Sequence, residues 1–264
     1  MALSLVVMGA SGRMGTTIAN LALEQGLKLA AVMERPEKVD ALAHWGCLAG
    51  SDVNAILPQV PGAVIIDFTA PEATMVTARA AVRHGNPMVI GTTGFSAEQK
   101  AELEQLALSG KLFWSPNMSV GINVLLEILP RLVRMLGPDY DLEMVELHHN
   151  RKKDSPSGTA LRLAECLADA RDWDLKDVAC YHREGIIGER PKKEIGIQAV
   201  RGGDVVGVHT VYFMGAGERI EVTHQAHSRE NFAQGALRAA RWIGGCTPGK
   251  LYSMSDILLS EVKS

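Results

Sequence analysis

The chain has 264 residues, of which 47% are hydrophobic and 22% charged, so it can bury a full core and is not disordered, collagenous or a coiled coil. Its formal net charge of −3 provides no overall basic field, and we expect neither nucleic acid nor a membrane surface as a partner. The apolar runs are too short to span a bilayer, and the N-terminus lacks the basic start and cleavage site of a signal peptide. The four cysteines form no CxxC pair, which favours free thiols in a reducing cytoplasm over disulfides or a zinc site.

The first half of the chain alternates short apolar runs with segments of helical spacing. Such alternation is typical of βαβ units and of a parallel sheet whose strands are buried on both faces. We expect strands at 3–8, 27–33, 64–68, 87–90 and 112–114, and helices at 12–25, 72–84 and 96–109.

The pattern changes after residue 119. A long apolar helix containing Pro130, a strand, a second helix, two strands joined by Gly-Ala-Gly and a late helix are predicted. These elements are expected at 122–136, 142–147, 157–171, 207–214, 218–225 and 231–244. We therefore expect an α/β protein with an N-terminal parallel sheet and an α+β region. The second sheet should be mixed or antiparallel, with helices on one face.

A glycine-rich loop joins the first predicted strand to the first helix. Gly9-Ala-Ser-Gly12-Arg-Met-Gly15 has the spacing GxxGxxG, which also suits a simple tight turn. After a strand and before a helix, such glycines let a pyrophosphate approach the helix N-terminus, so the sheet is predicted to be Rossmann-type. Glu34 ends the second strand, where these folds place the carboxylate that binds the adenine ribose hydroxyls. Arg35 can pair with a 2′-phosphate, stack on adenine or be a solvated charge, so both NADH and NADPH are candidate cofactors.

Two further loops follow the fourth and fifth strands, at residues 91–95 (GTTGF) and 115–119 (SPNMS). Ligands of open α/β sheets bind beyond the carboxyl ends of the strands. Both loops are therefore expected at the edge where a nicotinamide would lie, although each is also consistent with an ordinary turn.

The densest polar segment is 146–160, ELHHNRKKDSPSGTA. His148 and Lys152 stand at i and i+4, so on a helix or an extended strand they would share a face and act as acid–base groups near an anion. Ser157 is a good N-cap, and the amides of Gly158 and Thr159 at a helix start suit a carboxylate. The alternative is a solvated charge run with surface histidines. Adjacent histidines on a strand point to opposite faces, so no metal site is predicted.

Taken together, these residues resemble the 4-hydroxy-tetrahydrodipicolinate reductase (dihydrodipicolinate reductase) family of the diaminopimelate route to lysine. The segments that carry the resemblance are GASGRMG, the Glu34–Arg35 pair, DFTAPEAT, GTTGF, PNMSVGIN, ELHHNRKKDSPSGTA, RGGDVVGVHT and ERIEVTHQAHSRENFAQGA. The resemblance implies an NADH- or NADPH-dependent oxidoreductase that acts on a small cyclic dicarboxylate, and a cytoplasmic homotetramer. It also implies a dinucleotide-binding (Rossmann) domain at 1–119 and 229–264 and a substrate-binding and oligomerisation domain at 120–228.

The family pattern implies roles for particular residues. His148 matches the acid–base histidine, and Lys152 matches the lysine that donates the proton. Substrate would contact His149, Ser157, Gly158 and Thr159, and the cofactor would contact Gly9, Ala10, Ser11, Gly12, Arg13, Met14, Glu34, Arg35, Gly91, Thr92, Thr93, Ser115, Pro116, Asn117, Met118 and Phe232. The sequence departs from the pattern at Ser155, where alanine is frequent, and at Val208, where glutamate is common.

Two alternatives use the same features. A different Rossmann oxidoreductase, for an amino acid or a sugar, would have no reason to place the HH…K…PSGTA segment after a strand. A non-catalytic nucleotide-binding regulator would be free to lose His148 and Lys152, and the presence of both favours the reductase. The preference between NADH and NADPH, and enzyme assistance in the loss of water from the hydroxylated substrate, stay open.

Overall fold

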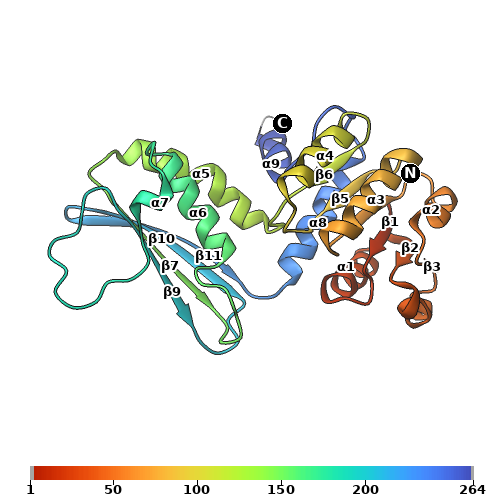
Figure 1. The fold of residues 1–264 in the computed structure, drawn as a ribbon, viewed down its shortest axis with the longest axis horizontal. Helices are drawn as coiled ribbons and strands as arrows, with labels where there is room; N and C mark the ends of the chain where they lie inside the picture. The colour runs from red at the N-terminus through yellow and green to blue at the C-terminus, as the bar shows by residue number, and fades with distance from the viewer. Residues whose placement is uncertain (1–2, 263–264) are drawn as a thin grey trace. The chain divides into compact units, whose positions relative to one another are not determined.

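The structure, a computed structural model, describes residues 3–262 (Figure 1). It divides into two compact units. The first comprises the chain through Val120 together with the chain from Arg229 onward, and the second runs from Gly121 to Ser228. The chain therefore leaves the first unit once and returns to it once.

The first unit is built on a six-stranded sheet in the order β3-β2-β1-β4-β5-β6, with every neighbouring pair parallel. The strands are β1 (Ser4–Met8), β2 (Lys28–Met33), β3 (Leu48–Gly50), β4 (Val64–Asp67), β5 (Met88–Ile90) and β6 (Leu112–Trp114). The helices are α1 (Arg13–Glu24), α2 (Val53–Ile56), α3 (Pro71–His84), α4 (Ala97–Ala107), α8 (Glu230–Ile243) and α9 (Met254–Val262), with 3-10 segments η1 (Pro36–Trp45) and η2 (Leu57–Gln59). The order is that of a Rossmann-type fold, so the predicted parallel sheet is confirmed. The elements β3, α2, α9, η1 and η2 were not predicted.

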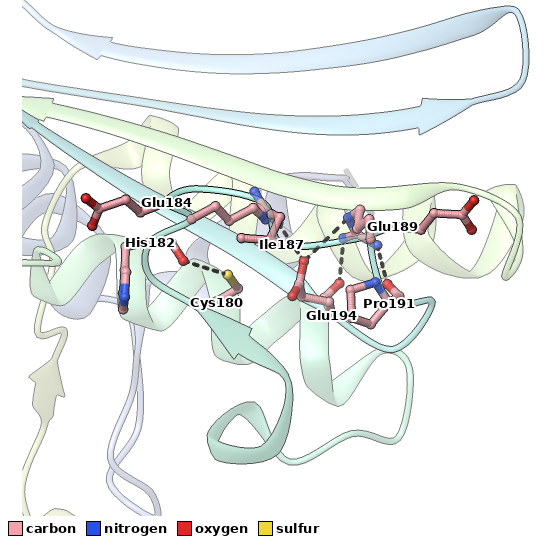
Figure 2. Close-up of a pocket in the computed structure, with 9 residues that line it drawn as sticks. Cys180, His182, Glu184, Ile187, Glu189, Pro191 and Glu194 are labelled. Carbon is pink, nitrogen blue, oxygen red and sulfur yellow. Dashed lines mark hydrogen bonds and ion pairs between the residues drawn. The ribbon is translucent and has the colours of Figure 1, made fainter.

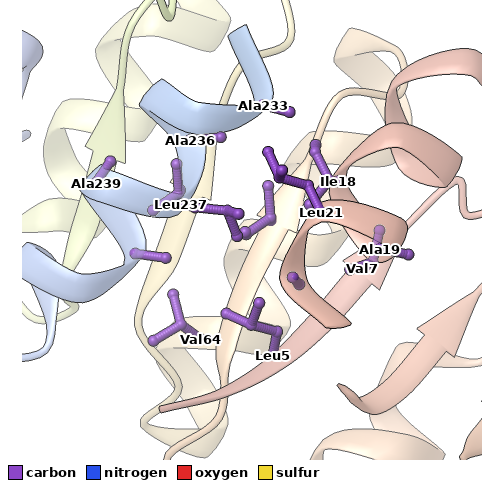
Figure 3. Close-up of a cluster of buried hydrophobic side chains, with 14 of the residues drawn as sticks. Leu5, Val7, Ile18, Ala19, Leu21, Val64, Ala233, Ala236, Leu237 and Ala239 are labelled. Carbon is purple, nitrogen blue, oxygen red and sulfur yellow. The ribbon is translucent and has the colours of Figure 1, made fainter. Parts of the chain in front are cut away.

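Alternate residues of the strands pack into two cores, one on each face of this sheet. Leu5 and Val7 of β1 pack with α1 and α8, whereas Val6 packs with α2, α3 and α4. Both faces are buried, which is why the strands read as continuous apolar runs. Figure 3 shows Leu237 of α8 beside Ile18 of α1, over β1 and β4. The late helix therefore completes the core of the first unit.

Local sequence signals set the ends of the helices that flank the sheet edge. Helix α3 begins at Pro71, at a position where proline has no helical hydrogen bond to lose, and ends before Gly85, whose φ is +73°. Helix α4 begins with a capping box, in which the Ser96 hydroxyl accepts the Gln99 amide at 3.2 Å and the Gln99 side chain accepts the Ser96 amide at 2.9 Å. The capping box fixes where the loop from β5 enters α4.

The second unit contains a five-stranded sheet in the order β11-β10-β7-β9-β8. Its strands are β7 (Asp141–His148), β8 (Ala179–Cys180), β9 (Ile195–Arg201), β10 (Gly207–Gly215) and β11 (Glu218–Ala226), and its helices are α5 (Val120–Leu136), α6 (Gly158–Asp169) and α7 (Leu175–Val178). Strand β10 is antiparallel to both β7 and β11, whereas β9 is parallel to β7. The expected mixed or antiparallel sheet is therefore mixed. Helix α5 continues through Pro130, and α7, β8 and β9 were not predicted.

Helices cover one face of the mixed sheet, as expected. Leu142 and Met144 of β7 pack in one core with Leu129 of α5 and Leu163 of α6. Side chains alternate along a strand, so the same face of β7 continues into the buried residues 146 and 148. The covered face therefore has an apolar centre and a polar end.

A network of ion pairs holds the loop between β8 and β9 against β7, beside the pocket drawn in Figure 2. Arg183 donates to both carboxylate oxygens of Glu143, at 3.0 and 2.7 Å, and Arg190 donates to the same carboxylate at 2.8 Å. Arg183 also pairs with Glu194 at 2.6 Å. A hollow of about 510 Å³ lies beside this network. Both guanidinium groups are already neutralised within the chain, so the hollow is a poor site for an anionic ligand.

Candidate functional site

The glycine loop turns the chain sharply from β1 into α1. Gly9 has a φ of +63°, a left-handed conformation that glycine adopts without strain, and its carbonyl accepts the Gly12 amide at 2.9 Å. A Cβ on Gly15 would lie 2.2 Å from the Gly9 carbonyl oxygen, so only glycine fits there. Gly12 is the N-cap of α1 and contributes no side-chain hydrogen bond. The first amides of α1 have no partner within the helix, which suits a pyrophosphate at this turn.

Glu34, which follows β2, is hydrogen-bonded to this loop. Its Oε2 accepts the Ser11 hydroxyl at 2.5 Å and the Ser11 amide at 3.2 Å, and its Oε1 accepts the Arg35 amide at 3.0 Å. Burial alone would raise the pKa of Glu34, but these hydrogen bonds outweigh it and hold the pKa below its ordinary value. Glu34 is therefore an ionised acceptor beside the glycine loop. Arg35 is exposed and pairs with Glu37 at 3.4 Å.

A cavity of about 480 Å³ opens beyond the carboxyl ends of β1, β2 and β4. Gly9, Glu34 and Arg35 line it, together with Thr69 and with Ala73 of α3. Its walls are largely apolar, and the Glu34 carboxylate is the charged acceptor among them, which suits an adenosine group. The α3 wall was not assigned from the sequence, although the DFTAPEAT motif marks it.

The loops after β5 and β6 lie at the same edge of the sheet, but several predicted residues point inward. Thr92 is 3% exposed, and its hydroxyl lies 2.9 Å from that of Thr74. Met118 is 2% exposed and belongs to the core. Thr93 and Pro116 are exposed. A ligand at this edge would therefore meet the backbone of these loops and a minority of their side chains.

Helix α8 lies against the second of these loops. A Cβ on Gly235 would lie 1.7 Å from the Met118 carbonyl oxygen, so the helix approaches closely because position 235 is glycine. Phe232, earlier on the helix, is half-buried against the same core. In the loop itself, the Ser115 hydroxyl donates to the Asn117 carbonyl at 2.7 Å. The structure thus brings Phe232 and the 115–118 loop, both predicted to contact the cofactor, into one region of the first unit.

In the second unit, His148 ends β7 with its ring on the helix-covered face, where it is 8% exposed. Its Nδ1 lies 2.5 Å from Oε2 of Glu146, which is fully buried. The Glu146 carboxylate also accepts both terminal nitrogens of Arg201, at 2.8 and 2.7 Å, and the amide of Ser157 at 2.9 Å. This polar cluster joins β7, β9 and the start of α6.

The charges of the cluster favour a neutral ring beside an ionised carboxylate. Burial lowers the pKa of His148, and the positive charges of Lys152 and Arg201 lower it further, against the opposing effect of Glu146. Burial would raise the pKa of Glu146, but the hydrogen bonds from Arg201, His148 and Ser157 hold it below its ordinary value. At neutral pH the imidazole is therefore uncharged and Glu146 is a carboxylate.

Lys152 lies in the turn after β7, so the expectation that it shares a regular strand or helix face with His148 is wrong. The turn forms because the Lys152 amide donates to the His149 carbonyl at 3.1 Å. The Lys152 ammonium pairs with Asp154 at 2.9 Å. This bond is the main cause of the lowered pKa of Asp154, whose carboxylate also takes part in a hydrogen bond with the Gly158 amide. Asp154 thus occupies the predicted proton donor, Lys152, and the amide of Gly158, which was predicted to bind substrate.

The start of α6 is capped and buried on its inner side. The Ser157 hydroxyl accepts the Ala160 amide at 3.1 Å and lies 3.1 Å from Nε2 of His209. Burial lowers the pKa of His209 to about 4, so its ring is neutral at pH 7 and shares one hydrogen bond with the Ser157 hydroxyl. Ser157 is 2% exposed and shapes the helix start, whereas Gly158 is exposed. His149 and Thr159, the other predicted substrate residues, are half-buried.

Glu146, Arg201 and His209 received no role from the sequence pattern. Glu146 and His148 stand at i and i+2, so their common strand face was a readable signal. The other two residues are brought in by strand pairing, which sets His148 opposite Arg201 of β9 and Glu146 opposite His209 of β10. Local patterns do not specify such long-range pairing.

Three further observations concern the described part of the chain. All four cysteines are free thiols. Residues 3–262 contain no group of three or more histidine, cysteine, aspartate or glutamate side chains placed to hold a metal ion. No helix within this range has the length and apolar character required to cross a membrane.

Comparison with known proteins covers nearly the whole chain. The family model described as dihydrodipicolinate reductase, N-terminus, matches residues 3–118, and the one described as dihydrodipicolinate reductase, C-terminus, matches residues 121–258. The chain is 72% identical over 258 residues to the 4-hydroxy-tetrahydrodipicolinate reductase of Nitratidesulfovibrio vulgaris strain DP4, covering 97% of this chain and 100% of that protein. It is 68% identical over 259 residues to the enzyme of the same name from strain Miyazaki F, covering 98% and 100%. The solved structure of dipicolinate-bound dihydrodipicolinate reductase from Paenisporosarcina sp. TG-14 has the same fold, with a TM-score of 0.77, 23% identity, and coverage of 96% and 98%.

Proposed function

The chain belongs to the dihydrodipicolinate reductase family, and on this premise we propose that it reduces 4-hydroxy-tetrahydrodipicolinate to tetrahydrodipicolinate with NADH or NADPH. The reaction proceeds by way of dihydrodipicolinate and belongs to diaminopimelate and lysine biosynthesis. The observation that carries the proposal is the buried, neutral His148 beside the start of α6 and the Lys152 ammonium. This arrangement joins an anion site to acid–base groups.

The first unit fits a dinucleotide, and we assign residues 1–119 and 229–264 to its binding. Because position 15 is glycine, the loop can form the tight turn at which its backbone comes close to a pyrophosphate. The ionised Glu34 faces a cavity suited to adenosine, where it would accept hydrogen bonds from the ribose hydroxyls. Arg35 would meet the 2′-phosphate of NADPH. The loops at 91–93 and 115–118 would line the nicotinamide. When bound, the nicotinamide supplies the hydride.

The second unit, residues 120–228, would bind the dicarboxylate. The amides of Gly158 and Thr159 at the start of α6 would hold one carboxylate, because helix N-termini attract anions. The Lys152 ammonium would pair with the substrate and donate the proton that the reduced ring takes up. His148 would serve as the second acid–base group, and His149 would add a hydrogen bond to the substrate.

A coupled assay tests the proposed reaction. A condensing synthase makes the substrate in situ from pyruvate and aspartate semialdehyde, and oxidation of NADH or NADPH is followed by the loss of reduced-nicotinamide absorbance. We expect oxidation that depends on the synthase. A folded protein that binds nucleotide but oxidises neither cofactor would contradict the proposal.

We also propose that the chain acts as a homotetramer in the cytoplasm. The four free thiols fit a reducing compartment, and the described helices of the second unit pack on one face of the mixed sheet, leaving the other without a helix of residues 3–262. Val200 and Met214, on that uncovered face, are 46% and 37% exposed, which suits burial between subunits. Light scattering on the purified protein should give four times the mass of the chain, and a monomer would contradict the assembly.

A further inference from the structure

We propose that Glu146 is a positioning residue that fixes which ring nitrogen of His148 carries the proton and ties that ring to the start of α6. The inference deepens the proposed function and rests on it in one respect, namely that His148 takes part in acid–base chemistry. No catalytic contact with substrate is assigned to Glu146, because its side chain is fully buried.

The Glu146 carboxylate is saturated by four donors. Its Oε2 accepts Nδ1 of His148 at 2.5 Å and one terminal nitrogen of Arg201 at 2.8 Å. Its Oε1 accepts the other terminal nitrogen of Arg201 at 2.7 Å and the amide of Ser157 at 2.9 Å. Two carboxylate oxygens offer about four lone-pair positions, so every position has a donor. A carboxylate surrounded by four donors accepts hydrogen bonds only and stays ionised.

This saturation determines the tautomer of the ring. Because Glu146 can only accept, Nδ1 of His148 must donate, and the neutral ring then has its lone pair on Nε2. Strand β10 comes close to that nitrogen because position 207 is glycine, since a Cβ there would lie 3.0 Å from Nε2. Nε2 is therefore the nitrogen available to exchange a proton with a ligand.

The same carboxylate also locates the groups around the substrate. It holds the Ser157 amide at the N-cap of α6, and its partner Arg201 donates to the Asp154 carbonyl at 2.9 Å. The Asp154 side chain in turn pairs with Lys152. The ion pair between the buried Glu146 and the half-buried Arg201 thus anchors the imidazole, the helix start and the turn that carries the ammonium.

The charged and titratable groups that face His148 come from every element around it. Glu146 lies on its own strand, Arg201 on β9, His209 on β10 with its ring centroid 5.2 Å away, and Lys152 in the turn. Arg201 and Lys152 disfavour the imidazolium, and His209 is neutral near pH 7. Glu146 is the anion that favours the imidazolium, so its removal should shift the titration of His148 to lower pH.

The test is Glu146→Gln, read by the ¹⁵N chemical shifts of the histidine ring nitrogens, with the His148 signals assigned from His148→Gln. In the wild type we expect a protonated Nδ1 and an unprotonated Nε2. In the variant the NH₂ of the new amide side chain can only donate, so it must face at least one of the groups that now donate to the carboxylate. If the amide oxygen keeps the hydrogen bond from the Ser157 amide, the NH₂ faces Nδ1 of His148. Nδ1 must then accept, and the ring proton moves to Nε2. Turnover should then fall about 10²–10⁴-fold with little change in KM, the usual effect of losing a general acid–base.

Glu143→Gln is the matched control, because Glu143 lies on the same strand and is also held by arginines, but on the opposite face of the sheet. We expect an unchanged His148 tautomer for this control, and wild-type turnover when light scattering gives it the same mass as the wild type. If Glu146→Gln does not fold, the double variant Glu146→Gln, Arg201→Gln removes both buried charges and gives the same readout.

Two results would overturn the inference: a wild-type ring protonated at Nε2 and bare at Nδ1, or full turnover in folded Glu146→Gln. The nitrogen shifts are measured without substrate. A wild type that lacks reductase activity would therefore refute the proposed function, while the shifts would still decide the tautomer.

Discussion

Replacing Glu34 by alanine tests how the nucleotide site distinguishes NADH from NADPH. In the structure three hydrogen bonds already reach this carboxylate, two from Ser11 and one from the Arg35 amide. Since a carboxylate has about four lone-pair positions, one is left for a ribose hydroxyl, and a second ribose hydroxyl must exchange with that of Ser11. The net gain for NADH is about one hydrogen bond to a charged acceptor.

Such a bond contributes about 1.5–3 kcal/mol, so Glu34→Ala should weaken NADH binding about 10- to 150-fold. In NADPH a phosphate replaces one ribose hydroxyl and is repelled by the carboxylate. Loss of Glu34 removes that repulsion at this half-exposed site, so the Kd for NADPH should change by about threefold or less. The Kd values for both nucleotides can be measured by calorimetry.

Ser11→Ala is the control, because it removes the serine hydroxyl from Glu34 but keeps the carboxylate. It should keep the preference for NADH or raise it, because a ribose hydroxyl can then take the lone-pair position that the Ser11 hydroxyl leaves. If Glu34→Ala leaves the ratio of the two Kd values at its wild-type value, the assignment of Glu34 to the ribose hydroxyls is refuted.

Asp154→Asn removes the carboxylate that pairs with Lys152, and the substrate must displace this carboxylate in the wild type. We expect the KM for the substrate to fall about three- to tenfold in steady-state assays, and a higher KM would contradict this. Gly15→Ala would place a Cβ 2.2 Å from the Gly9 carbonyl oxygen, so the loop must shift; calorimetry should show at least about tenfold weaker nucleotide binding, and wild-type affinity would argue against a pyrophosphate at this turn. His209 has a pKa of about 4 when folded against 6.5 ordinarily, so the unfolded chain binds the extra proton first. The resulting stability is complete above about pH 6.5 and falls by about 3 kcal/mol as the pH drops to 4. Urea unfolding at several pH values in that range should show that the free energy of unfolding depends less steeply on pH in His209→Gln than in the wild type. An equal pH dependence in the two proteins would contradict this expectation.

The parallel sheet could be predicted because β1, β2, β4, β5 and β6 read as apolar runs. Strand β3 was not predicted because it has only three residues and lies at the sheet edge, where Leu48 is 39% exposed and Gly50 has no side chain. Strand β9 was not predicted because Gly196 and Gln198 interrupt its run of apolar side chains. Its parallel pairing with β7 depends on contacts between remote segments, which no local pattern contains.

The candidate site divides in the same way. The density of polar residues was enough to single out His148, Lys152 and the start of α6. It did not show that Lys152 pairs with Asp154, or that the side chain of Thr92 turns into the interior. A motif identifies positions along the chain, whereas burial and strand pairing decide whether a side chain or the backbone faces a ligand.

Turnover of Lys152→Ala in the synthase-coupled assay tests the account most directly, with Lys153→Ala as the neighbouring control because Lys153 is exposed. We predict a turnover about 10²–10⁴-fold lower for Lys152→Ala, with unchanged nucleotide affinity, and near-normal turnover for Lys153→Ala. Normal turnover of Lys152→Ala would remove this ammonium from the reaction and contradict the proposed site.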